Sequence, residues 1–138
     1  MNRFDIIIWG ASSFTGKLVT EYFFKNFGSN KIKWAIAGRN KSKLENIRLE
    51  LADEKIPILV ADSFDERSLS LIVKETRVIC STVGPYAIYG SLLVELCVKH
   101  STNYCDITGE VHWIRKMIDR FHEDAIKSSI EMLRNLND

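Results

Sequence analysis

The chain has 138 residues, 46 % of them hydrophobic and 27 % charged, with a net charge of +1 at pH 7. This length and composition are those of one globular domain with a substantial core. The near-neutral charge argues against a nucleic-acid-binding protein, which is normally strongly basic. No apolar run reaches the roughly 18 residues of a membrane span, and the N-terminal residues have no secretory signal pattern.

The three cysteines, Cys80, Cys97 and Cys105, contain no C-x-x-C pair and leave an odd thiol. We expect reduced and mostly buried thiols, and therefore a cytoplasmic protein without a zinc site or other metal. No histidine is spaced from these residues in a way that indicates a catalytic cysteine.

Short apolar segments alternate with amphipathic ones along the whole chain. We expect strands at residues 4–9, 34–37, 58–61, 78–81 and 104–107, each followed by a helix. Capping boxes at Ser42–Glu45 and Ser63–Glu66 predict two of the helix starts. This alternation predicts an α/β fold, a doubly wound parallel sheet of the Rossmann type with strand order 3-2-1-4-5 and helices on both faces.

The predicted domain covers residues 1–127, and residues 128–138 form a C-terminal tail. We expect this tail to be too polar for a buried sixth strand. An uncovered sheet edge or apolar patch where that strand is missing would favour a homo-oligomer.

The turn between the first strand and the first helix, Gly10-Ala11-Ser12-Ser13-Phe14-Thr15-Gly16, has the order that a dinucleotide diphosphate site requires. Gly10 allows a sharp reversal, and Gly16 allows the helix to lie close to the strand. The diphosphate then meets N–H groups at the helix N-terminus. Ser13 replaces the middle glycine of the usual pattern, and its hydroxyl either donates to a phosphate or caps the helix.

Ligands bind beyond the carboxyl ends of parallel strands, so the residues that follow each strand are site candidates. Arg39, followed by Asn40, stands where an NAD-specific site carries a carboxylate. A guanidinium can bind a 2′-phosphate instead, which favours NADP over NAD. Asp62 follows the third strand and either hydrogen-bonds the adenine or caps the next helix.

The loops after the fourth and fifth strands supply the remaining candidates. Thr82, Gly84 and Pro85 lie in a loop that should pass along the nicotinamide ribose, or else form a plain connector. Asp106 and Glu110 flank a Thr-Gly turn. They either orient a substrate and transfer a proton, or favour the positive end of the next helix.

Four motifs occur in the order found in one enzyme family. Gly10–Gly16 is similar to GA(T/S)GFTG, Ala37–Asn40 to AGR(N/S), Val83–Tyr86 with Gly90 to VGPY…G, and Tyr104–Glu110 to Y-x-D-x-TGE. Together they resemble the saccharopine dehydrogenase-like oxidoreductases, which include the trans-acting enoyl reductases. The resemblance runs from residue 4 to about residue 127. It implies an N-terminal Rossmann domain that binds NAD(P), followed in the family by a larger substrate domain that is absent from this chain.

The resemblance implies an NADP-binding domain of an enzyme that moves a hydride between nicotinamide and a substrate. Without the second domain we expect no turnover by the chain alone, and its substrate and catalytic residues stay unassigned. The expected cofactor contacts are Gly10, Ser12, Ser13, Phe14, Thr15, Gly16, Arg39, Asn40, Asp62, Thr82, Gly84 and Pro85, with Tyr86, Asp106, Gly109 and Glu110 on the substrate side.

Two other functions stay open at this point. A non-catalytic, NADP-sensing regulator of the NmrA type also begins with a GATG-x-TG turn, although the VGPY and DITGE stretches count against it. A doubly wound domain whose ligand site has decayed is the third hypothesis, because Ser13 alters the phosphate loop and a fold alone does not establish a function.

Overall fold

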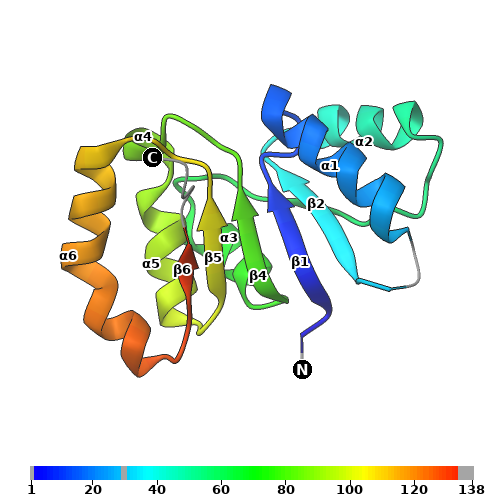
Figure 1. Ribbon diagram of the computed structural model, residues 1–138. Helices are drawn as coiled ribbons and strands as arrows, with labels where there is room; N and C mark the ends of the chain where they lie inside the picture. The colour runs from blue at the N-terminus through cyan, green and yellow to red at the C-terminus, as the bar shows by residue number, and fades with distance from the viewer. Residues whose placement is uncertain (1, 29–30, 134–138) are drawn as a thin grey trace.

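The computed structural model describes residues 2–28 and 31–133. Within them, six parallel strands form one sheet in the order β3-β2-β1-β4-β5-β6 (Figure 1). The predicted order 3-2-1-4-5 is therefore confirmed, with one short strand added at its edge. The strands are β1 (Phe4–Trp9), β2 (Trp34–Gly38), β3 (Ile58–Val60), β4 (Thr76–Ser81), β5 (Asn103–Asp106) and β6 (Met132–Leu133).

The helices divide between the two faces of the sheet because the strand order reverses between β1 and β4, and right-handed crossovers then lie on opposite faces. Side chains of α1 and α2 pack with Ile8 and Ile36 on one face. Side chains of α3, α5 and α6 pack with Ile7 and Ile79 on the other. The helices are α1 (Phe14–Phe27), α2 (Lys41–Glu50), α3 (Glu66–Val73), α4 (Tyr86–Tyr89), α5 (Ser91–Lys99) and α6 (Val111–Lys127).

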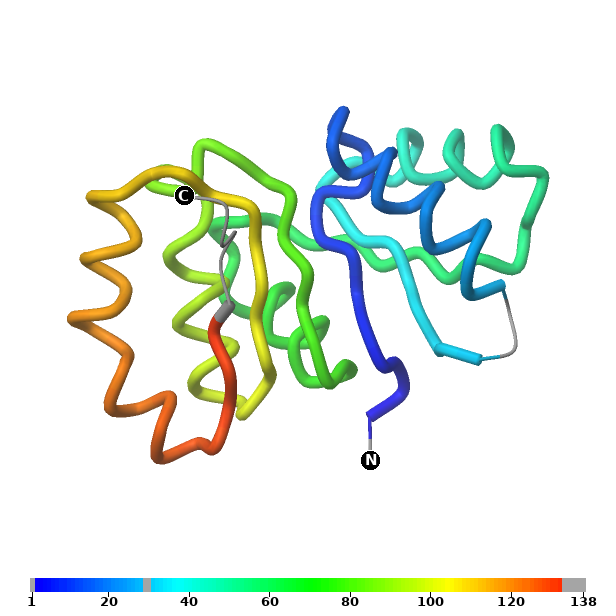
Figure 2. The backbone as a smooth tube through the Cα atoms, viewed as in Figure 1, coloured from blue at the N-terminus to red at the C-terminus, as the bar shows by residue number. Residues whose placement is uncertain are grey.

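This division places α1 and α2 on the half of the molecule that carries β1 and β2, and α5 and α6 on the half that carries β5 and β6 (Figure 2). Over residues 2–28 and 31–133, no helix combines the length and the apolar character needed to cross a bilayer.

Both predicted capping boxes are wrong. Asn40 caps α2 instead of Ser42, because its Oδ1 accepts a hydrogen bond from the Lys43 N–H at 3.2 Å. Asparagine is as good a cap as serine, and here it comes first along the chain. Before α3, the Oδ1 of Asp62 accepts from the Phe64 N–H at 2.8 Å. This Asx turn lengthens the loop, so that α3 begins only after Asp65.

The expectation of no sixth strand is also wrong. Met132 and Leu133 pair in parallel with Tyr104 and Cys105 of β5. The Tyr104 N–H donates to the carbonyl of Glu131 at 3.0 Å. Backbone groups on the edge of β5 accept a partner whatever its side chains are, so the polarity of the tail did not prevent the pairing. The rest of the predicted tail, residues 134–138, lies outside the described residues.

Candidate functional site

A cleft of about 370 Å³ opens beyond the carboxyl ends of β1 to β4, at the point where the strand order reverses. Open α/β sheets bind their ligands at this position. Most of the predicted cofactor contacts line the cleft, whereas Phe14, Thr15, Gly16 and Pro85 do not. The predicted residues that line it are Gly10, Ser12, Ser13, Arg39, Asn40, Asp62, Thr82 and Gly84.

The two glycines of the first loop have the roles that the sequence predicts for them. Gly10 has a φ of +83°, and a Cβ added there would lie 2.4 Å from the Cγ2 of Val83. A Cβ added to Gly16 would lie 2.0 Å from the carbonyl oxygen of Gly10 and 2.8 Å from the Cα of Ala11. Gly10 therefore allows the turn, and Gly16 allows α1 to pack directly against the end of β1.

Ser13 caps α1. Its Oγ donates to the Gly10 carbonyl at 2.8 Å and accepts from the Gly16 N–H at 3.0 Å. The hydroxyl hydrogen therefore closes the loop internally, and Ser13 has the capping role, which is the second of the two predicted alternatives. Among the described residues, the N–H groups of Ser12, Phe14 and Thr15 donate to no backbone or side-chain acceptor. These groups are available to an anion at the N-terminus of the helix.

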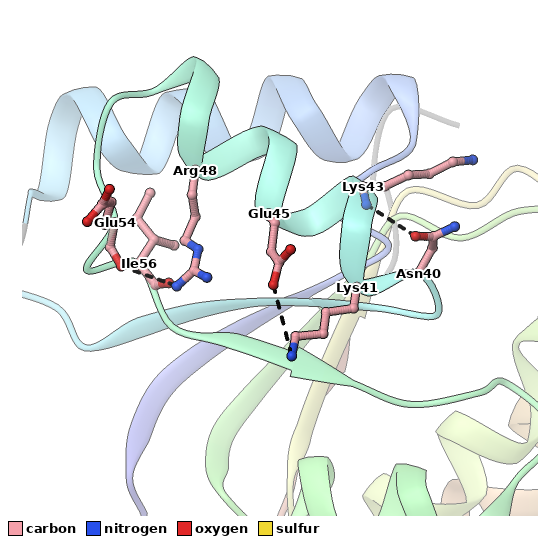
Figure 3. Close-up of polar contacts among 7 residues, drawn as sticks. All are labelled: Asn40, Lys41, Lys43, Glu45, Arg48, Glu54 and Ile56. Atoms are coloured by element: carbon pink, nitrogen blue, oxygen red, sulfur yellow. Dashed lines mark hydrogen bonds and ion pairs between the residues drawn. The ribbon is translucent and has the colours of Figure 1, made fainter.

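The cations near β2 differ in their surroundings. Lys41 points toward Glu45, with 4.0 Å between Nζ and Oε1, whereas Lys43 extends in another direction (Figure 3). Arg48 is also engaged, because its guanidinium donates to the carbonyls of Glu54 and Ile56. Arg39 and Lys43 line the cleft, and in the described part of the chain neither forms an ion pair. Together they give this end of the cleft a positive charge.

Sequence reasoning did not single out Lys43 as a site residue. It was one of several lysines around β2, and most of them are exposed on the surface. Its position in the first turn of α2, four residues after Arg39, is the signal that distinguishes it. At this spacing a side chain can reach back over the loop that carries the arginine.

Two aromatic side chains at the cleft were also missed. Phe64 follows β3 and Tyr89 ends α4, and their ring centroids are 5.6 Å apart. The Phe64 side chain is 65 % exposed although both residues line the cleft. Phe64 lies in the loop that follows β3, and this place in the fold was the signal available in the sequence.

The predicted substrate-side residues do not line the cleft. Tyr86 is buried, and its hydroxyl donates to the Ser81 carbonyl at 3.1 Å. The Glu110 carboxylate accepts from the N–H groups of Tyr86 and Ala87 at 2.6 and 3.1 Å. Glu110 therefore binds the N-terminus of α4 rather than that of α6, the helix that follows it. Gly109 is exposed, and an added Cβ would meet no atom within 4 Å.

Glu110→Gln should lower the free energy of unfolding by about 1–2 kcal/mol, because an amide can present only one oxygen to the two N–H groups. Glu95, which is exposed on α5, supplies the matched control, since Glu95→Gln removes the same charge without such bonds. Urea unfolding of both variants measures the difference. An equal loss of unfolding free energy in the two variants would contradict the capping role of Glu110.

Asp106 is buried and joins two neighbours. Its Oδ2 accepts from the Tyr104 hydroxyl at 2.6 Å, and its Oδ1 accepts from the Thr108 N–H at 3.0 Å. Burial raises the pKa of this carboxyl although both hydrogen bonds act in the opposite direction. Burial also raises the pKa of the Tyr86 phenol to about 12. Asp106 thus fixes the loop after β5 and Tyr86 the loop after β4, and Glu110 joins the two.

Asp106→Asn should make the stability of the protein less dependent on pH. Because the pKa of Asp106 is raised in the folded state, its contribution to stability is full below the unfolded-state pKa and is lost as the pH rises through the folded-state pKa. An amide does not titrate, so the variant should keep its stability over this window. Urea unfolding between about pH 4 and pH 7 gives both curves. Parallel curves would show that the folded-state pKa of Asp106 is not raised.

Comparison with known proteins supports a nicotinamide-dinucleotide-binding domain. The model of the saccharopine dehydrogenase NADP-binding domain matches residues 6–132. A trans-acting enoyl reductase of Mycobacterium tuberculosis is 34 % identical over 133 residues, which are 95 % of this chain and 31 % of the relative. A lipid droplet localized protein of Caenorhabditis elegans is 33 % identical over 136 residues, 94 % of this chain and 32 % of the relative. The chain thus spans about a third of these relatives.

Solved structures share the fold at low sequence identity. Saccharopine dehydrogenase (L-Glu forming) from Saccharomyces cerevisiae matches with a TM-score of 0.75 at 15 % identity, over 96 % of this chain and 27 % of that one. Leucoanthocyanidin reductase from Vitis vinifera, solved with NADPH, matches with a TM-score of 0.66 at 17 % identity, over 94 % of this chain and 48 % of that one. Since the family model covers nearly the whole chain, the protein belongs to the saccharopine dehydrogenase NADP-binding domain family.

Proposed function

We propose that the cleft binds NADP in preference to NAD, as the cofactor site of an oxidoreductase. One observation carries this proposal. The cations Arg39 and Lys43 line the same cleft as Ser12, whose unbonded N–H group adjoins those of Phe14 and Thr15 at the N-terminus of α1, and a dinucleotide with an additional phosphate needs both. No carboxylate follows β2 at the position where it would repel that phosphate.

The diphosphate is assigned to the N–H groups of Ser12, Phe14 and Thr15. Gly10 and Gly16 allow the backbone to come close, and Ser13 fixes the turn from within. The Thr82 Oγ1 lies 2.9 Å from the Trp9 carbonyl and 3.0 Å from the Gly10 carbonyl. Thr82 therefore holds the phosphate loop against the end of β4 and acts as a positioning residue.

The adenosine end of the cofactor is assigned to the loops after β2 and β3. The Arg39 guanidinium and the Lys43 ammonium receive the 2′-phosphate. Asp62 uses Oδ1 for the Phe64 N–H, which leaves Oδ2 for the adenine amino group. The exposed ring of Phe64 offers a flat apolar surface to the base.

The nicotinamide end is assigned to the loop after β4, where Gly84 lines the cleft and Glu110 fixes the following turn. When bound, the nicotinamide supplies the hydride, and the residues of this chain bind and orient it. The rest of the substrate site lies in the part of the relatives that this chain does not match. The similarity to trans-acting enoyl reductases favours hydride transfer to a substrate double bond.

The two alternative functions have less support. A family match over residues 6–132 and relatives named as enoyl reductases favour an oxidoreductase domain over a non-catalytic NmrA-type regulator. An intact phosphate loop beside a basic cleft argues against a decayed site. The described structure contains three free cysteines, as is typical of the reducing cytoplasm, and we propose that location.

Titration calorimetry of the chain with NADPH and NADH tests the proposal directly. We expect saturable binding of NADPH and binding of NADH at least tenfold weaker, which corresponds to about 1.4 kcal/mol. Flat titrations with both cofactors would overturn the proposed function, and equal affinities would overturn the preference for NADP.

A further inference from the structure

Two of the three cysteines lie side by side on neighbouring strands. Cys80 of β4 and Cys105 of β5 are register partners in the parallel ladder. Partners in such a ladder direct their side chains to the same face of the sheet. Both residues are partly exposed, and neither forms a disulfide. The third cysteine, Cys97 of α5, is fully buried.

The face that carries the two thiols is open in the described structure. The neighbouring residues Ile79 and Tyr104 point into the core formed with α3, α5 and α6, so Cys80 and Cys105 point to the opposite face. On that face α1 contacts β1, and α2 contacts β2 and β3. Figure 1 shows no described helix in front of β4 and β5 on this side.

We propose that Cys80 and Cys105 form a redox-sensitive dithiol that oxidises to an intrachain disulfide. Neighbouring strands lie about 4.8 Å apart, which is within the range of about 4.4–6.8 Å between the Cα atoms of disulfide-bonded cysteines. The backbone separation of register partners is therefore compatible with a disulfide. This inference does not depend on the proposed cofactor.

The oxidant in this proposal is a small-molecule disulfide such as oxidised glutathione. The thiolate of one cysteine attacks its S–S bond, forms a mixed disulfide and releases one small thiol. The thiolate of the second cysteine then attacks the protein sulfur of the mixed disulfide. The Cys80–Cys105 bond forms, and a second small thiol leaves. The protein loses two electrons and two protons, and the oxidant is reduced to two thiols.

Either thiol can begin this exchange, and the direction of the pKa shifts favours Cys105. The hydrogen bond between the two thiols lowers the pKa of Cys105, although burial and the Asp106 carboxylate act in the opposite direction. The same hydrogen bond, together with burial, raises the pKa of Cys80. A lower pKa increases the thiolate fraction, which is the reactive form. Cys80 then resolves the mixed disulfide.

The pair lies just before the loops after β4 and β5, the first of which lines the cleft. Cys80 is followed by Ser81 and then by Thr82, which lies within hydrogen-bonding distance of the Gly10 carbonyl. Cys105 is followed directly by Asp106, whose carboxylate accepts from Thr108. A covalent link at this register would fix the two strands immediately before both loops.

Incubation of the native protein with oxidised glutathione, followed by intact mass spectrometry and peptide mapping, tests the proposal. The monomer should lose about 2 Da, equal to two hydrogens, and yield one peptide pair linked through Cys80 and Cys105. Cys80→Ser should instead accumulate a stable glutathione adduct on Cys105. Cys97→Ser is the matched control and should oxidise like the wild type.

Three outcomes would overturn the proposal that Cys80 and Cys105 form a redox-sensitive dithiol. They are a linkage that involves Cys97, glutathione adducts on the wild type without an intrachain bond, and unchanged thiols under conditions that oxidise a free dithiol. If a serine variant does not fold, which circular dichroism would show, the peptide map of the wild type alone decides between these outcomes.

Discussion

Gly16→Ala should abolish cofactor binding and lower the free energy of unfolding by about 3 kcal/mol or more. The added Cβ would lie 2.0 Å from the Gly10 carbonyl oxygen and 2.8 Å from the Cα of Ala11. Both are backbone atoms, so the overlap can be relieved only if α1 moves away from β1. That movement would break the cap between Ser13 and the Gly16 N–H and displace the N–H groups assigned to the diphosphate.

Gly109→Ala is the matched control for this substitution. A Cβ at Gly109 meets no atom within 4 Å, so an alanine there should be neutral or slightly stabilising through the unfolded state. Urea unfolding followed by circular dichroism measures stability, and titration calorimetry measures NADPH binding. A Gly16→Ala protein as stable as Gly109→Ala would show that the close approach of α1 to β1 does not depend on glycine.

The features that the sequence predicted correctly depend on local backbone constraints. The apolar run of β1 and the glycines at positions 10 and 16 specify a strand, a turn and a closely packed helix within a short stretch of chain. The strand order then follows from right-handed crossovers and the position of that first loop. Such constraints can be recognised without knowledge of the rest of the molecule.

The errors concern contacts between distant segments and competition among nearby caps. Glu110 binds N–H groups on α4 that lie 24 and 23 residues earlier in the chain, and its sequence neighbours give no sign of this partner. Met132 joins the sheet because β5 has an unpaired edge, not because its own segment favours a strand. Asn40 caps α2 and Asp62 forms an Asx turn before α3, each ahead of the serine that was predicted to cap the helix.

The cleft residues that were predicted follow strands, whereas two of those that were missed lie on helices. Arg39 and Thr82 stand directly after β2 and β4, which is where the fold concentrates ligand contacts. Lys43 and Tyr89 reach the cleft from helical positions, and only the three-dimensional arrangement separates them from surface residues. Asp106 and Glu110 show the converse, because they follow a strand and yet serve as internal hydrogen-bond acceptors.

Arg39→Ala should weaken NADPH binding by about 10- to 100-fold and leave NADH binding nearly unchanged. A hydrogen bond to a charged group contributes about 1.5–3 kcal/mol, and a tenfold change in affinity corresponds to about 1.4 kcal/mol. The guanidinium can form a paired contact with the 2′-phosphate, a group that NADH lacks. Titration calorimetry with each cofactor gives the ratio of wild-type to variant affinity for NADPH and for NADH.

Two lysines of α2 test whether this effect is specific. Lys43 lines the cleft, so Lys43→Ala should weaken NADPH binding by up to about tenfold. Lys41 pairs with Glu45 and lies on the same helix, so Lys41→Ala should leave both affinities unchanged. If all three substitutions weaken NADPH binding equally, the preference arises from the general positive charge of this region and not from a defined phosphate contact. If Arg39→Ala weakens the binding of both cofactors equally, Arg39 contacts a part of the molecule that NADH and NADPH share.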